Sequence, residues 1–229
     1  MRWWGRRHQV YRLAFGDSEV RLCYRCGMEF TANNPEAPTT RAAEGLPRRP
    51  WTVAEIERMV EAGIIDEHER FELIGGEIVP MSPKGNWHEN VKRALTVHWA
   101  KALPQELYML TETTLRIGGR DFREPDFVFW PSSVKVSDLA PKHVRLIVEV
   151  SDSSLGYDLG RKADYYASLG LADYWVIDAK RLMTRIHRDP GANGYASISD
   201  KTHNQLMTPL SVPVLAVTLA GLGLEPMMD

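Results

Sequence analysis

The segment between Arg123 and Asp178 constrains the fold of this chain more than any other stretch. It contains three short apolar runs, each rich in aromatic or β-branched residues and flanked by polar ones: Phe127–Trp130, Val144–Val150 and Tyr174–Ile177. Runs of this length and composition predict β-strands. A stretch of helical character that ends at Gly170 separates the second run from the third. This order predicts a right-handed crossover between two parallel strands.

Two carboxylates lie at the ends of these runs. Asp126 precedes the first run and Glu149 lies near the end of the second. Because a nearly continuous apolar run indicates a strand buried on both faces, each carboxylate needs a partner or a cation to offset its burial. The crossover brings the next helix, with Asp158 as its expected N-cap and Lys162 in its first turn, back to the end of the Glu149 strand. We therefore expect Asp126, Glu149 and Lys162 to converge.

A metal site is one interpretation of this convergence, and a purely structural one is the other. Two carboxylates that share one place suit a hard cation such as Mg²⁺, which needs only one or two of them and keeps several waters. In the structural interpretation, Asp126 caps a turn after Pro125, and Glu149 forms a buried salt bridge with Lys162 or Arg161. The residues alone leave both interpretations open.

Four short motifs in this part of the chain, taken in order, resemble one protein family. They are Glu124-Pro125-Asp126, then Val148-Glu149-Val150-Ser151, then Tyr157-Asp158 with Lys162, and finally Tyr174-Trp175 with Asp178. Together they resemble the Uma-type restriction endonucleases, which belong to the PD-(D/E)XK nuclease superfamily. The resemblance covers about Trp51 to Leu224, most of the chain.

The resemblance implies a fold, an activity and a set of site residues. The fold is a restriction-endonuclease-like α/β domain, with a mixed β-sheet flanked by helices. The activity is cleavage of DNA that depends on Mg²⁺, or alternatively Mn²⁺, with Asp126, Glu149 and the carbonyl of Val150 as metal ligands. The superfamily pattern places a lysine two residues after the glutamate, where this chain has Ser151. Lys162, on the following helix, is expected to replace it.

Glu72 and His88 complete the expected site. Glu72 falls in the first strand of a hairpin predicted around Gly75-Gly76, where the resembling family has a comparable acidic position. Its alternative is an ordinary exposed strand carboxylate. His88 lies in the first turn of a helix predicted over Trp87–Leu103, where it would orient a phosphate or a water, or else serve only the structure.

The remaining apolar patterns predict further elements. Thr52 and Glu55 form a capping box that opens a short helix. Alternation over Leu107–Ile117 predicts one strand, and a terminal hairpin turns through Pro190–Gly194. The apolar stretch Leu215–Leu224 is expected to cover an edge of the sheet.

The first fifty residues differ in charge from the rest of the chain. The whole chain carries −2, but nine arginines and five acids give Met1–Pro50 a net charge of +4, which leaves −6 for residues 51–229. We interpret residues 1–50 as an extension and linker, and 51–229 as the nuclease-like domain. The arginines would contact phosphate or form a solvated tail. Cys23 and Cys26 supply half of a zinc site, to be completed by His8 or by a second subunit, or are two ordinary thiols on a turn.

Composition sets the remaining expectations. No run reaches the roughly 18 to 20 apolar residues of a membrane span, so we expect no membrane partner and a cytoplasmic protein. A duplex has two strands of opposite polarity, which favours a two-fold homodimer with DNA as its substrate. The alternative function is a nucleic-acid-binding or regulatory protein that keeps the nuclease fold without cleaving.

Overall fold

The computed structural model describes residues 12–15, 18–22, 29–31 and 48–227. The chain divides into two compact units, Met1–Arg48 and Arg49–Asp229. In the first unit, strands β1 (Arg12–Phe15), β2 (Ser18–Leu22) and β3 (Glu29–Thr31) form an antiparallel sheet in that order. The candidate zinc residues Cys23, Cys26 and His8 lie outside the described residues.

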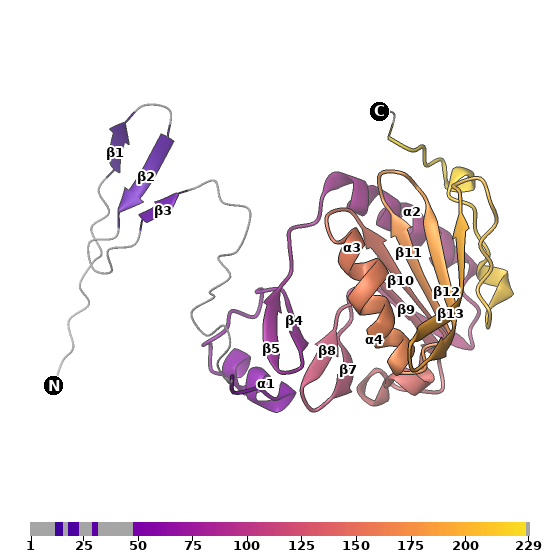
Figure 1. The fold of residues 1–229 in the computed structure, drawn as a ribbon, viewed down its shortest axis with the longest axis horizontal. Helices are drawn as coiled ribbons and strands as arrows, with labels where there is room; N and C mark the ends of the chain where they lie inside the picture. Colours follow the sequence, from indigo (N-terminus) through magenta and orange to yellow (C-terminus); the bar gives the residue numbers. More distant parts are fainter. Residues whose placement is uncertain (1–11, 16–17, 23–28, 32–47, 228–229) are drawn as a thin grey trace. The chain divides into compact units, whose positions relative to one another are not determined.

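A six-stranded mixed sheet forms the centre of the second unit (Figure 1). Its strand order is β13-β12-β11-β10-β9-β6. The bounds are β6 Leu107–Leu110, β9 Phe127–Pro131, β10 Leu146–Ser151, β11 Asp173–Asp178, β12 Thr184–Gly191 and β13 Gly194–Lys201. Strands β10 and β11 are parallel, and the other neighbouring pairs are antiparallel. The predicted mixed sheet, parallel crossover and terminal hairpin are all present.

The two faces of this sheet have separate apolar cores because side chains alternate along each strand. In β10, Val148 packs with Trp99 of helix α2 (Asn86–Ala102), whereas Ile147 packs with Tyr166 on the other face. Figure 1 shows α2 on one side of the sheet and the helical segment α3–α4 on the other. The ends of β9 and β10 are therefore enclosed by helices from both sides.

The crossover helix starts earlier than its sequence indicates. It consists of α3 (Leu155–Tyr157), a π-helical turn η3 (Asp158–Lys162) and α4 (Ala163–Ser168), and it ends at Gly170 with φ of 74°, as predicted. Asp158 is therefore not the N-cap, because three helical residues precede it. The wider π turn instead buries both Asp158 and Lys162. Such turns occur often at functional sites.

A smaller four-stranded sheet, in the order β5-β4-β8-β7, stands beside the central one. Its strands are β4 Phe71–Ile74, β5 Glu77–Pro80, β7 Leu115–Gly118 and β8 Asp121–Arg123. Gly75 and Gly76 make the predicted hairpin turn, with φ of 59° and 83°. Helix α1 (Val53–Glu61) begins with the expected capping box and contributes Ile56 to the sheet's own apolar cluster.

Two further expectations about the elements were wrong. The stretch Leu107–Ile117 is split between β6 and β7, in different sheets, with Glu112 between them at φ of 52°. Apolar and polar residues alternate through both strands, so the sequence pattern does not indicate the break between them. The stretch Leu215–Leu224 covers a face of the sheet and not its edge: Leu215 is buried in the α2 core, and its carbonyl accepts a hydrogen bond of 3.0 Å from the Trp99 indole.

Short 3₁₀ turns complete the second unit: η1 Val136–Asp138, η2 Pro141–His143, η4 Pro213–Leu215 and η5 Ala220–Leu222. Within the described part of the chain, every helix is too short or too polar to cross a membrane.

Candidate active site

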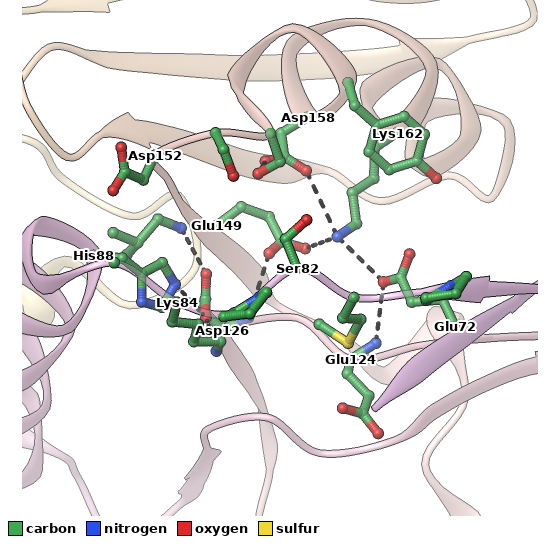
Figure 2. Close-up of a pocket in the computed structure, with 18 of the residues that line it drawn as sticks. Glu72, Ser82, Lys84, His88, Glu124, Asp126, Glu149, Asp152, Asp158 and Lys162 are labelled. Atoms are coloured by element: carbon green, nitrogen blue, oxygen red, sulfur yellow. Dashed lines mark hydrogen bonds and ion pairs between the residues drawn. The ribbon is translucent and has the colours of Figure 1, made fainter. Parts of the chain in front are cut away.

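A cavity of about 490 Å³ opens where the two sheets meet the start of the crossover helix (Figure 2). Glu72 of β4, Asp126 just before β9, and Glu149 of β10 face it, together with Asp158 and Lys162 of the π turn. The loop before α2 closes it with Met81–Gly85. Residues from five separate parts of the sequence therefore meet in one place.

The Lys162 ammonium lies among three carboxylates. Its Nζ is 2.9 Å from Glu149 Oε1, 3.3 Å from Glu72 Oε1 and 3.7 Å from Asp158 Oδ1, as the dashed lines of Figure 2 show. Burial favours the neutral amine, but these acids, Glu149 foremost, raise the pKa of Lys162 well above its usual range. Lys162 is therefore a buried cation.

Asp126 and Glu149 are adjacent because β9 and β10 are paired. The register that sets Phe127 opposite Val148 continues to these two acids. The backbone N–H of Asp126 approaches Glu149 Oε2 at 3.4 Å, and the N–H of Val150 donates to Asp126 Oδ2 at 2.9 Å. The structure thus brings together three of the residues expected from sequence, with Val150 beside them.

The two carboxylates have opposite proton affinities. Complete burial raises the pKa of Glu149 to about 8, although Lys162 opposes the shift, while the charges of Asp158 and Asp126 add to it. Burial also acts on Asp126, but a 3.0 Å hydrogen bond with His88 Nε2 and the nearby Lys84 ammonium hold the pKa of Asp126 below its usual range. Asp126 is therefore ionised at neutral pH, whereas Glu149 binds a proton more tightly than an ordinary glutamate.

A second group of charges, which the sequence reading did not single out, neutralises Asp126. Lys84 Nζ lies 2.8 Å from Asp126 Oδ1 and also contacts Glu112. Lys92 Nζ lies 2.8 Å from Glu112 Oε1 and 3.9 Å from Asp126 Oδ1. Lys84 lies in the loop before α2, four residues ahead of His88. This proximity to His88 in the sequence was the one indication that Lys84 belongs to the site.

Ser151 occupies the position where the superfamily pattern has a lysine, and its side chain contacts the crossover helix. Its hydroxyl donates to Asp158 Oδ2 at 2.7 Å, and the Ser154 hydroxyl donates to the same oxygen at 2.6 Å. The other oxygen of Asp158 faces Lys162. The strand residue thus helps to fix an acid that lies one helical turn before the lysine.

Glu72 and His88 are both buried, so the alternative of an exposed strand carboxylate is wrong for Glu72. Glu72 Oε1 accepts from the Glu124 N–H at 3.3 Å as well as facing Lys162. The second ring nitrogen of His88, Nδ1, lies 3.1 Å from Glu89 Oε1. Through these contacts Glu72 borders Lys162, and His88 borders Asp126.

The donor set at Asp126 and Glu149 fits a hard divalent cation. Both groups offer carboxylate oxygens, and buried Oε1 of Glu149, apart from its ion pair with Lys162, accepts no hydrogen bond from the described residues. Among those residues, no three His, Cys, Asp or Glu side chains surround a common metal position. A cation here would use the two carboxylates, the Val150 carbonyl and water, which suits Mg²⁺.

The fold is a nuclease-like mixed α/β fold. Among solved structures, a protein from Anabaena variabilis ATCC 29413, described as a "putative nuclease belonging to DUF820", has a similar fold with a TM-score of 0.58. The two sequences are 15% identical, and the match covers 76% of this chain and 97% of that one. Among curated proteins, none matches the chain.

The family model described as "Uma2: Putative restriction endonuclease" matches residues 53–220. The chain belongs to this family, as the motifs around Asp126, Glu149 and Lys162 indicated.

Proposed function

We propose that this protein is a nuclease that hydrolyses DNA phosphodiester bonds with Mg²⁺, or Mn²⁺ in its place, as cofactor. The observation that carries the proposal is the contact of 2.9 Å between Lys162 Nζ and Glu149 Oε1, beside Asp126 in an open cavity. Membership in a restriction endonuclease family supports it. The metal-binding residues in this proposal are Asp126, Glu149 and the carbonyl of Val150.

Each residue has a role that follows from its surroundings. When bound, the cation would neutralise the phosphate and favour a nucleophilic water. Lys162, whose pKa is raised, remains an ammonium and stabilises negative charge on the reacting phosphate rather than accepting a proton. Glu72 and Asp158 hold that ammonium in position. His88 orients Asp126.

The test is a titration of Mg²⁺ and Mn²⁺ with supercoiled plasmid and single-stranded DNA as substrates. Asp126→Asn keeps the shape of the side chain and removes its charge, so cleavage should fall by about 10²-fold or more. Asp138→Asn, at an exposed position of η1, is the matched control and should cleave normally. Equal cleavage by Asp126→Asn and the unmodified protein would refute the assignment.

A second candidate function is DNA binding without cleavage, and one observation favours it. Asp126 already has an ammonium, that of Lys84, at 2.8 Å, so its charge is balanced within the protein. In that case the protein binds DNA in the same titration but leaves both substrates intact at every metal concentration.

A further inference from the structure

A second cavity adjoins the candidate active site. It measures about 560 Å³ and lies between the β4–β5 hairpin and the crossover helix. Val79 and Tyr157 line both cavities, so the two cavities adjoin at these side chains. The ring centroid of Tyr157 is 6.0 Å from Lys162 Nζ. A strand with one phosphate near Lys162 would therefore continue past Tyr157 into this cavity.

One side of the crossover helix presents an aromatic–cationic–aromatic stripe to the second cavity. Tyr157, Arg161 and Tyr165 are spaced by four residues, and all three line it. Grooves that bind single-stranded nucleic acid combine the same two components, aromatic rings for stacking and cations for the backbone.

The Tyr165 ring is held in place from behind. The guanidinium carbon of Arg123 lies 4.6 Å from the ring centroid of Tyr165. Arg123 is itself fixed, because its Nη1 donates to the Leu73 carbonyl at 2.6 Å and the residue is buried. A ring in contact with a fixed cation is preorganised for stacking with a planar partner.

The charges in the cavity suit a base and one phosphate. Arg161 is exposed and has no ion-pair partner among the described residues. Asp121 and Glu77 also line the cavity. Their negative charge disfavours a second phosphate in this cavity.

We propose that this cavity binds an unpaired nucleobase of the DNA strand whose phosphate occupies the candidate active site. The base stacks on Tyr165, and Arg161 contacts the adjoining phosphate. A base enclosed in this way has no room for its pairing partner, so the substrate is DNA with a single-stranded segment. The placement of the strand rests on the proposed nuclease function, whereas the base-binding cavity does not.

Binding in EDTA tests the proposal without any cleavage. The probes are fluorescein-labelled octathymidylate and an abasic octamer with the same number of phosphates, compared by fluorescence anisotropy. The protein should bind the thymidylate at least about fivefold more tightly, as expected for base–aromatic stacking. Tyr165→Leu should abolish this preference, and Arg161→Ala should weaken binding of both probes.

Two matched controls separate stacking from general damage. Tyr165→Phe keeps the ring over Arg123 and should retain the preference. Tyr108→Leu removes an exposed tyrosine of β6, on the central sheet, and should also retain it. Circular dichroism melting of every variant identifies any that fails to fold.

Equal binding of the two probes by the unmodified protein, or an undiminished preference in folded Tyr165→Leu, would overturn the inference. The proposed function fails separately. If no DNA is cleaved with Mg²⁺ or Mn²⁺ while the Tyr165-dependent preference is present, the nuclease assignment is refuted and the assignment of the base-binding cavity is supported. If cleavage depends on Asp126 while the preference for thymidylate is absent, only the assignment of the base-binding cavity is refuted.

Discussion

Lys162 neutralises acids that come from three different parts of the chain. Glu72 belongs to the small sheet, Glu149 to the central sheet, and Asp158 to the helix that carries the lysine. A buried charge without a partner destabilises the folded state. Removing one member of this group would therefore leave the remaining charges unpaired and lower the stability of the protein. The stability of this site and its chemistry therefore depend on the same contacts.

The proton held by Glu149 should make stability depend on pH in the metal-free protein. The pKa of Glu149 is about 8 in the folded protein and near its ordinary 4.5 when unfolded, so between these values the folded state binds more protons. Stability should then fall as pH rises from about 5 to 8, by at most about 1.4 kcal/mol per pH unit. Glu149→Gln should flatten this slope in urea unfolding measured in EDTA, whereas Glu106→Gln, at an exposed position, should keep it.

Replacing the lysine should affect both stability and cleavage. Lys162→Met keeps most of the side-chain volume but leaves Glu149 and Glu72 without their cation, which should cost about 3–5 kcal/mol. The loss should be smaller at pH 5, where Glu149 is protonated, than at pH 9, where it is ionised. Cleavage should be undetectable even at temperatures where the variant is fully folded. Lys142→Met, at an exposed position, is the control, and a Lys162→Met variant that cleaves normally would contradict the role of the ammonium.

The elements themselves show which features a sequence can predict. The crossover and the hairpins were predictable because each strand is a compact apolar run and each turn has its own signal, such as Gly170 or Gly75-Gly76. The split of Leu107–Ile117 was not, because alternation is the same on both sides of Glu112.

The candidate site, like the fold, was only partly predictable from the sequence. The motifs pointed to Asp126, Glu149 and Lys162 because strand ends and a crossover have a fixed geometry. Lys84 and Lys92 were missed because a lysine in a loop or on a helix looks solvated until its partner is known. Because the helix starts earlier than expected, Asp158 lies in the candidate site and not at the helix N-cap. The π turn that contains Asp158 has no recognisable sequence pattern.

The hairpin that carries Glu72 offers a matched pair of substitutions. Gly75 and Gly76 both have positive φ, so alanine is strained at either position. At Gly76 a Cβ would also lie 2.6 Å from Pro50 Cβ and 2.8 Å from the Trp51 carbonyl oxygen, whereas at Gly75 it would meet nothing within 4 Å. We expect Gly76→Ala to lower the free energy of unfolding by at least about 1 kcal/mol more than Gly75→Ala. Equal losses in chemical unfolding would show that the Pro50 contact is unimportant.

At the scale of the whole molecule, we expect a two-fold dimer, since one site cuts one strand and a duplex has two. Within the described residues, Leu210 and Val214 remain 50% and 62% exposed beside the buried Leu215. This apolar surface is available for an interface. Light scattering at micromolar concentration, with and without DNA, should give twice the monomer mass, and Val214→Glu should reduce it. A constant monomer mass in all samples would contradict the dimer.

The meeting of two sheets at one cavity also affects how the molecule opens. The β4–β5 hairpin packs in a separate apolar cluster with α1 and Phe122, whereas Leu115 of β7 packs with the central sheet. The hairpin can therefore open as a separate cooperative unit while the central sheet stays folded. Glu72 would leave Lys162 in that event, and the wall shared by both cavities would move with Val79. Hydrogen exchange should then be faster in β4 and β5 than in β10, and a bound strand of DNA should slow it. A strand could enter through this opening motion without global unfolding, so the rate of exchange in β4 would set an upper limit on the rate of its entry.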